Sequence, residues 1–203
     1  MRETRTILYL HGFASSGASG TVDLLRREFW SAAEKHRVEI VAPDIPVDPA
    51  EALPMLRETL ENVLPDLVIG TSMGAMYAQQ LRGVLRICVN PSFDLSRKYS
   101  ILSVGRHKWL SPRKDGSREF HVTKDTVAHF REMEERQFDG ITEGDRALCH
   151  ALFGDSDEFA AAARPVFESH YPGMSHIFPG GHRMNDAVVK HTLIPFIRSL
   201  GAI

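Results

Sequence analysis

A serine with a glycine two positions away on each side is the strongest chemical signal in this sequence. The pentapeptide Gly70-Thr71-Ser72-Met73-Gly74 follows an apolar run at residues 67–69 and opens a helical pattern over residues 73–81. A G-x-S-x-G segment between a strand and a helix is typical of a nucleophile elbow, a sharp turn that exposes the serine hydroxyl. Glycines suit these positions because the turn is strained and its backbone crowded. We expect Ser72 to be a nucleophile; a tight turn without chemistry is the alternative.

A serine hydroxyl becomes a nucleophile when a base accepts its proton and an acid orients that base. Around such an elbow the partners follow in the chain order serine, acid, histidine. The expected base is His182, in the glycine-rich segment 178–182 after the last strand pattern. His176 within that strand, His191 in a helix and His170 are weaker candidates, and none of the histidines need be catalytic.

The acid is expected after the strand pattern at residues 147–153, at the end of a strand where α/β sheets place catalytic groups. The segment Gly154-Asp155-Ser156-Asp157-Glu158 follows that strand. Asp157 is the favoured acid, because the G-x-x-D pattern turns the chain back toward the histidine loop, and Asp155 is the second candidate. Asp155 or Ser156 could instead cap the next helix while Asp157 acts in catalysis.

Two backbone N–H groups are expected to stabilise an oxyanion at this site. One belongs to Met73, directly after the serine, and the other to Phe13, in the His11-Gly12-Phe13 segment after the first strand. His11 is placed in the pocket lining, where its ring would bond within the loop. The other candidate pocket walls are aromatic residues and one methionine that could equally belong to the core: Phe13, Met76, Phe93, Trp109 and Phe130.

The elements that must position these groups alternate between strand and helix. Apolar runs predict strands at residues 6–10, 38–42, 67–69, 85–89, 147–153 and 174–178. Helical patterns cover residues 21–36, the stretch after the N-cap Asp48 and Pro49, residues 73–81, a helix broken near Pro165, and residues 184–200 with a bend at Pro195. This alternation predicts an α/β fold with about six mostly parallel strands and helices on both faces.

The alternation pauses at residues 94–145, which we expect to form a lid-like insert in a single domain spanning residues 1–203. Asp115-Gly116 predicts a hairpin turn between Trp109 and Phe120, and residues 125–138 resemble a helix. The segment 97–124 has eight Lys and Arg, whereas 125–145 has seven Asp and Glu. These halves either face solvent and pair weakly, or the basic half attracts an anionic substrate.

Composition narrows the class of protein. The chain has 203 residues, 43% of them hydrophobic and 25% charged, and its net charge is −2. This balance is typical of a globular protein and gives no global electrostatic case for binding nucleic acid. No apolar stretch reaches the roughly 18 residues of a membrane-spanning helix, and the start resembles a strand more than a signal peptide. We therefore expect a cytoplasmic protein without membrane contact, either a monomer or a homodimer, with Cys88 and Cys149 as buried thiols.

With these motifs assembled, the chain resembles the α/β-hydrolase superfamily. The agreement runs through LHGF at 10–13, GTSMG at 70–74, GDSD at 154–157 and GGH at 180–182, nearly the whole length. More narrowly, the chain is similar to the small bacterial esterases of the YqiA/YcfP-like family. That family shares an H-G-F-x-S-S opening, an Asn-Pro after the strand that follows the nucleophile helix, here Asn90-Pro91, and a short insert before the acid.

The resemblance implies an ester or thioester hydrolase with the triad Ser72, Asp157 and His182, the backbone donors Phe13 and Met73, and no metal or organic cofactor. Two departures stand out. Leucine and glycine are expected where this chain has Met73 and Ala75, which affects pocket shape, and the acid motif has an extra aspartate, which leaves the acid's identity open.

We expect hydrolysis of small or medium acyl esters, because the loop is H-G-F and there is no large cap. One rival is a thioesterase for an anionic acyl carrier such as coenzyme A, suggested by the basic segment 97–124. Another is a ligand-binding homologue without turnover. The expected partner is a small-molecule ester or thioester substrate.

Overall fold

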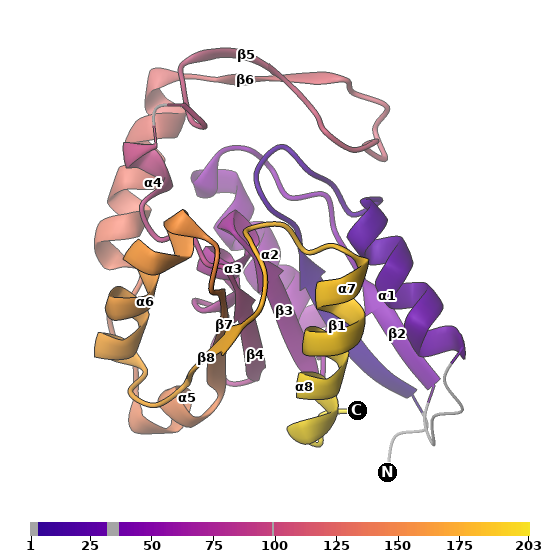
Figure 1. Ribbon diagram of the computed structural model, residues 1–203. Helices are drawn as coiled ribbons and strands as arrows, with labels where there is room; N and C mark the ends of the chain where they lie inside the picture. The colour runs from indigo at the N-terminus through magenta and orange to yellow at the C-terminus, as the bar shows by residue number, and fades with distance from the viewer. Residues whose placement is uncertain (1–3, 32–36, 99) are drawn as a thin grey trace.

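The computed structural model describes residues 4–31, 37–98 and 100–203. Its centre is a six-stranded parallel sheet in the order β2-β1-β3-β4-β7-β8 (Figure 1). The strands are β1 Thr4–Leu10, β2 Arg37–Val41, β3 Leu67–Thr71, β4 Leu85–Val89, β7 Cys149–Gly154 and β8 Ser175–Phe178. The predicted α/β class, with helices around a mostly parallel sheet, is confirmed.

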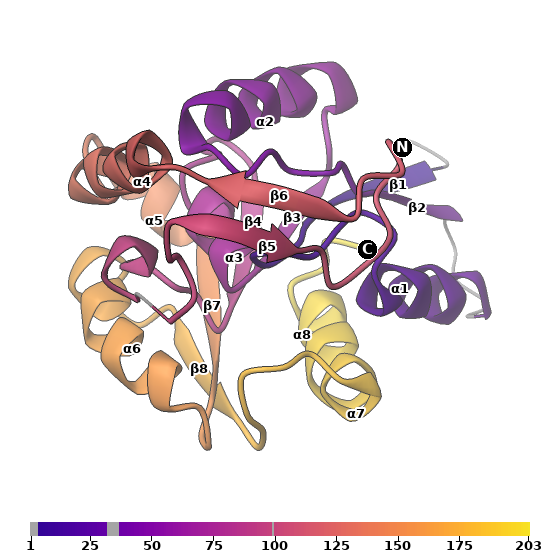
Figure 2. The ribbon, with the colours of Figure 1, turned by 90° about the horizontal axis from the view of Figure 1, so that it is seen from above.

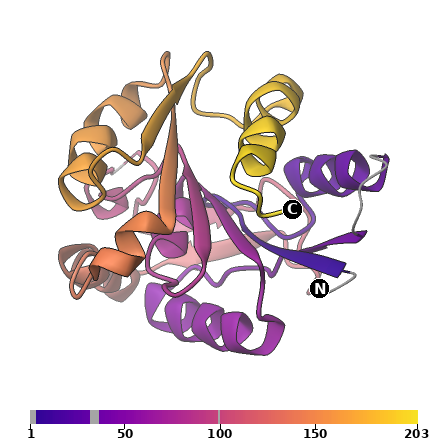
Figure 3. The same ribbon diagram turned by 90° about the horizontal axis from the view of Figure 1, so that it is seen from below.

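Helices cover both faces of this sheet (Figure 3). The helices are α1 Gly20–Ser31, α2 Pro49–Val63, α3 Met73–Ala78, α4 Lys124–Arg136, α5 Glu143–Ala147, α6 Glu158–His170, α7 Asp186–Val188 and α8 Ile194–Ser199. Leu56 of α2, Met76 of α3 and Phe167 of α6 share one buried cluster. Leu25 of α1 and Ile197 of α8 belong to a second cluster on the opposite face.

The central strands β1 and β3 contain continuous apolar runs because both of their faces are covered. In β1, Ile7 and Tyr9 pack into the cluster beneath α1 and α8. Their neighbours Leu8 and Leu10 point to the opposite face and join the cluster beneath α2 and α3. Alternation along the strand thus supplies two cores from one short segment.

Helix α2 begins as the sequence predicted. The Asp48 side chain accepts a hydrogen bond from the Ala50 N–H at 2.9 Å, and Pro49 occupies the first helical position. Proline is favoured there because that N–H would have no partner within the helix.

Two expectations about helices need correction. Helix α6 runs unbroken from Glu158 to His170 through Pro165. The proline removes one backbone hydrogen bond, but Ala163 and Phe167 on either side of it are buried in the core and hold the helix together. The last helical segment begins at α7 after the N-cap Asn185, not at residue 184.

Before Pro195 the last helix changes geometry. A π-helical turn, Val189–Leu193, separates α7 from α8. Such turns accommodate a residue that cannot make the regular backbone bond. The predicted end of the first helix, at residues 32–36, lies outside the described residues.

The insert between β4 and β7 contains the predicted hairpin, formed by β5 Gly105–Lys108 and β6 Glu119–Val122, which pair antiparallel. The hairpin extends across the carboxyl end of the sheet (Figures 1 and 2). Helix α4 follows it and ends at Arg136, two residues before the predicted boundary. Helix α5 was not predicted, because its five residues are too few to show a clear period.

Both cysteines are buried and free, with 4.0 Å between the sulfur atoms of Cys88 and Cys149. Among the helices in the described ranges, none combines the length and apolarity needed to cross a membrane.

Two histidines on neighbouring strands make stability depend on pH. His176 Nε2 lies 3.4 Å from His150 Nδ1. Burial lowers the pKa of both rings, and nearby His176 lowers that of His150 further. Both are therefore neutral in the folded protein near neutral pH, whereas the unfolded chain takes up protons at the ordinary histidine pKa of about 6.5. The contribution of these two histidines to the free energy of unfolding is therefore full above about pH 6.5, and it decreases as the pH falls below that value.

We expect His176→Gln to show a smaller loss of unfolding free energy than the wild type between about pH 7.5 and pH 5, measured by urea denaturation. His121→Gln, at an exposed position of β6, is the control and should lose as much as the wild type. An unchanged pH dependence in His176→Gln would contradict the prediction.

Candidate active site

Ser72 occupies a strained turn between β3 and α3. Its φ of 53° and ψ of −116° lie in a region that non-glycine residues rarely adopt. Backbone hydrogen bonds to the next strand hold it there. The Ser72 N–H donates to the Val89 carbonyl at 3.0 Å, and the Ser92 N–H donates to the Ser72 carbonyl at 3.2 Å. The sequence-predicted elbow is therefore present in the backbone.

The flanking glycines permit close packing between this turn and its neighbours. A Cβ atom on Gly70 would collide with the carbonyl group of Gly74, and a Cβ on Gly74 would collide with the carbonyl of Leu10. Helix α3 can therefore pack directly against the end of β1. Any larger residue at either position would push the helix and the serine out of place.

Three side chains form a continuous hydrogen-bonded chain at this turn. His182 Nε2 lies 3.0 Å from Ser72 Oγ, and His182 Nδ1 lies 2.7 Å from Asp157 Oδ2. The Asp157 side chain is almost fully buried, whereas the His182 side chain is 34% exposed. A buried carboxylate, an accessible imidazole and a hydroxyl in this order can move a proton away from the serine.

The structure distinguishes the two candidate acids by their partners. The exposed Asp155 accepts hydrogen bonds from the Gly180 N–H at 3.1 Å and from the Ser156 hydroxyl at 2.9 Å. These donors lower the pKa of its carboxyl group, and they tie the acid loop to the histidine loop. Asp157, and not Asp155, contacts His182.

The structure decides which residue caps the next helix. Asp157 itself caps α6, because its Oδ1 accepts the Phe159 N–H at 3.0 Å while Oδ2 faces His182. A carboxylate has two oxygens, so one group serves both purposes. Neither Asp155 nor Ser156 is needed as the cap.

The other candidate histidines have different environments. His176 contacts His150 and the ring of Phe196, and His170 stacks on Phe138 with 4.1 Å between ring centroids. His191 is exposed in the π-helical turn. Over the described residues, none of these rings hydrogen-bonds to Ser72.

The loop after β1 passes beside the serine. A Cβ built on Gly12 would lie 3.5 Å from the Cβ of Ser72. His11 is buried beneath this loop, with its Nδ1 2.8 Å from the Gly12 carbonyl, while the Ile45 N–H donates to its Nε2 at 3.0 Å. Burial lowers the pKa of His11 to about 4, so the ring is neutral and its Nδ1 carries the proton. His11 fixes the loop and does not line an open pocket.

The hairpin insert contacts the loop that follows β1. The Leu110 N–H donates to the Ala14 carbonyl at 2.7 Å. The Phe13 ring meets Phe120 and His107 edge-on, with centroids 5.5 and 6.1 Å away. The position of the Phe13 backbone therefore depends on an element about a hundred residues further along the chain.

The predicted pocket walls divide between the hairpin and the core. Trp109 is half-buried against Phe120, with ring centroids 4.1 Å apart. Phe93 is buried against Phe138, and Phe130 is completely buried in α4. Met76 is also fully buried. Their placement favours the core interpretation for Phe93, Phe130 and Met76.

Two side chains near His182 were not predicted from the sequence. The half-exposed ring of Phe159 lies edge-on to the His182 ring, with centroids 5.6 Å apart. The Lys98 ammonium lies 4.9 Å from the centre of that Phe159 ring and donates to Ser92 Oγ at 2.7 Å. Phe159 follows the acid motif by two residues, which is the signal that could have identified it.

Asn90 joins the three loops of the site. It is buried at the end of β4, where its Oδ1 accepts the Gly154 N–H at 2.8 Å. Its Nδ2 donates to the carbonyls of Gly181 and His182, at 3.0 and 3.2 Å. Its φ of 46° is one that asparagine tolerates better than most residues. A polar residue at the carboxyl end of a central strand is a signal for such a role.

We expect Asn90→Ala to lower the free energy of unfolding by about 2 to 4 kcal/mol, because a buried N–H and two carbonyls lose their partner. Urea denaturation measures this loss. Asn90→Gly tolerates the positive φ and should be destabilised almost as much. Wild-type stability in Asn90→Gly would show that backbone conformation alone matters at this position.

Comparison with known proteins shows the family and the fold of this chain. The model of an uncharacterised protein family, UPF0227, matches residues 6–152. Est1E from Butyrivibrio proteoclasticus superposes with a TM-score of 0.69 at 15% identity, covering 98% of this chain and 89% of its own. The esterase domain of a Rhodothermus marinus protein gives 0.61 at 16% identity, covering 96% and 87%. The fluorophosphonate-binding serine hydrolase F (FphF) of Staphylococcus aureus gives 0.60 at 12% identity, covering 98% and 84%.

At these identities the likeness to solved structures concerns the fold, and it agrees with the resemblance inferred from the motifs. The match to the family model covers well over half of the sequence. The chain belongs to the uncharacterised protein family UPF0227, and its fold is that of the α/β-hydrolase superfamily.

Proposed function

We propose that this protein hydrolyses carboxylic esters of small or medium acyl groups through an acyl-enzyme on Ser72. The observation that carries the proposal is the hydrogen-bonded chain from Asp157 through His182 to a serine held at a positive φ. The structural neighbours include an esterase domain and a serine hydrolase, which supports the same chemistry.

In the first half of the reaction, Ser72 Oγ attacks the ester carbonyl carbon while its proton passes to His182 Nε2. The tetrahedral intermediate collapses when the C–O bond of the leaving alcohol breaks and His182 returns the proton to that oxygen. In the second half, a water gives its proton to His182 and attacks the acyl-enzyme, and the carboxylic acid departs as Ser72 regains its proton.

Asp157 sets the protonation pattern of the base. Its Oδ2 lies 2.7 Å from His182 Nδ1 and accepts a hydrogen bond there, which leaves Nε2 free to accept the serine proton. Because the other oxygen caps α6, the carboxylate has little freedom to rotate. Asp157 also stabilises the imidazolium that forms when His182 is protonated.

The oxyanion would be bound by the N–H groups of Met73 and Phe13. Met73 is the first residue of α3, where backbone N–H groups have no partner within the helix. The close approach of Gly12 to Ser72 supports a donor from the neighbouring loop. Such preorganised donors supply a large share of catalysis in acyl transfer.

The hairpin insert, within residues 94–145, is proposed to act as a lid over this site. Its aromatic residues pack on Phe13, and Phe159 borders His182. These aromatic rings would offer apolar contacts to a small or medium acyl group.

Ser72→Ala should reduce turnover of a short p-nitrophenyl ester by at least about 10³-fold while the fold is retained, because the nucleophile is removed. Absorbance at the nitrophenolate band measures turnover, and circular dichroism checks the fold. A fluorophosphonate probe should label Ser72 of the wild type, as located by mass spectrometry. Ser103→Ala, at an exposed serine, is the matched control. Retained turnover in Ser72→Ala would refute the acyl-enzyme proposal.

Asp157→Asn should lower kcat by about 10⁴-fold, because the amide no longer holds the proton on His182 Nδ1. Asp155→Asn removes the same charge two residues away and should change kcat by less than about tenfold. Steady-state kinetics on the same ester compares the two variants. Equal losses in both would mean that the charge of the loop, and not its contact with His182, is what matters.

A further inference from the structure

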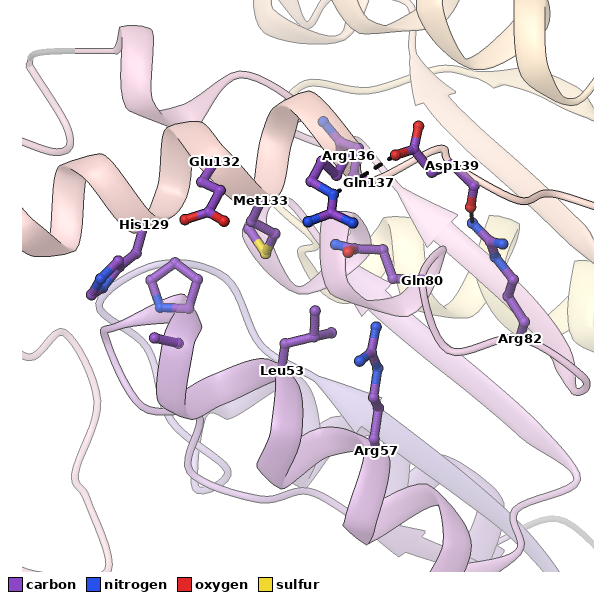
Figure 4. A pocket seen from close by; sticks show the side chains of 12 residues that line it. Leu53, Arg57, Gln80, Arg82, His129, Glu132, Met133, Arg136, Gln137 and Asp139 are labelled. Atoms are coloured by element: carbon purple, nitrogen blue, oxygen red, sulfur yellow. Dashed lines mark hydrogen bonds and ion pairs between the residues drawn. The ribbon is translucent and has the colours of Figure 1, made fainter.

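A cavity whose lining includes none of Ser72, Asp157 and His182 lies between α2 and α4. Its volume is about 590 Å³, and its wall is completed by the segment that follows α3 (Figure 4). Leu53 of α2 and Met133 of α4 face each other at its centre. The cavity therefore has an apolar middle that water solvates poorly.

Three arginines from three separate elements line one end of this cavity: Arg57 of α2, Arg82 after α3 and Arg136 of α4. Arg57 and Arg136 extend from opposite walls toward the same space, and the Gln80 amide lies between them (Figure 4). Like charges that converge on a concave surface repel one another unless an anion lies between them.

The acidic side chains in the cavity wall neutralise the charges of these arginines only weakly. Arg136 lies 3.8 Å from the Asp139 carboxylate, and both side chains are about three-quarters exposed (74% and 73%), so this pair contributes little. Arg82 donates to the Asp139 backbone carbonyl at 2.6 Å, and its buried Nε has no hydrogen-bond partner. In the part of the chain that the structure describes, Arg57 forms neither an ion pair nor a hydrogen bond.

At the opposite end the carboxylates of Asp48 and Glu132 disfavour an anion. His129 Nδ1 lies 2.8 Å from the Asp48 carboxylate, and Glu132 is nearby in the wall. An anionic group is therefore favoured at the arginine end alone. A ligand that fills the cavity would place its charge there and its body against Leu53 and Met133.

We propose that this cavity binds a phosphate monoester with an apolar or aromatic body. Guanidinium groups match phosphate oxygens with paired N–H donors. A phosphate monoester offers three terminal oxygens and up to two negative charges to several arginines at once, whereas a carboxylate offers two oxygens and one charge. The apolar centre accommodates the esterified group. This binding site is separate from the ester hydrolysis proposed at Ser72.

Phenyl phosphate is the probe for this site, and isothermal titration calorimetry measures its affinity for the full chain. Arg57→Gln and Arg136→Gln should each weaken binding by about tenfold or more, since each removes a charge-assisted hydrogen bond. Both residues are exposed, so the variants should fold, and thermal unfolding verifies this. Arg26→Gln, at an exposed arginine of α1, removes the same charge elsewhere and should bind as the wild type does.

Two comparisons complete the test. Benzoate should bind at least about tenfold more weakly than phenyl phosphate, because it lacks the third oxygen. Ser72→Ala should bind phenyl phosphate normally. The proposal is overturned if phenyl phosphate does not bind the wild type, if Arg26→Gln loses as much affinity as Arg57→Gln, if benzoate binds equally well, or if Ser72→Ala alone abolishes binding.

Discussion

The close contact between helix α3 and the end of strand β1 is the constraint on which the site depends. Gly74 lies so near the Leu10 carbonyl, and Gly70 so near Gly74, that neither position has room for a side chain. This contact brings the first turn of α3 beside the loop at Gly12. The proposed oxyanion donors, the N–H groups of Met73 and Phe13, belong to these two neighbouring segments.

Side-chain hydrogen bonds between loops position the acid loop and the histidine loop relative to each other. Asn90 links the end of β4 to the acid loop at Gly154 and to the histidine loop at Gly181. Asp155 links the same two loops through Gly180. The strands provide a common edge, and these side-chain bonds set the spacing between the loops that leave it.

The hairpin adds a third kind of support. It is an antiparallel pair outside the central sheet, and its backbone binds the loop after β1 at Ala14. Aromatic packing on Phe13 reinforces this contact. The insert therefore supports the loop that contains Phe13, the proposed oxyanion donor.

The sequence predicted the strands and helices with a clear hydrophobic periodicity. It also predicted the catalytic candidates, because serine, acid and histidine follow one another in a known order along the chain. Six strands, the elbow and the α2 cap follow from alternation, glycine spacing and Asp48-Pro49. The sequence favoured Asp157 over Asp155, but the choice depended on which carboxylate faces His182, and only the folded loop shows that. The predicted helix break near Pro165 was wrong, because packing of the helix against the core outweighs the loss of one backbone hydrogen bond.

The positions of Asn90 at a strand end and of Phe159 after the acid motif are sequence signals, but the contact partners of Asn90, Phe159 and Lys98 could not be derived in the same way. Each acts through contacts with residues distant in the sequence, and no local spacing records such a partner. The same is true of the cavity between α2 and α4, whose three arginines come from separate parts of the chain.

The positive φ of Ser72 also bears on how such a protein can be made more stable. A residue held in this region costs about 1 to 3 kcal/mol of folding free energy, and glycine would relieve most of that cost. Selecting variants for thermal stability alone would therefore favour glycine at position 72, the one substitution there that improves the backbone and removes the hydroxyl. Glycine at position 72 would favour stability, whereas serine is needed for the proposed chemistry. Engineering for heat resistance must therefore keep Ser72 and change other positions.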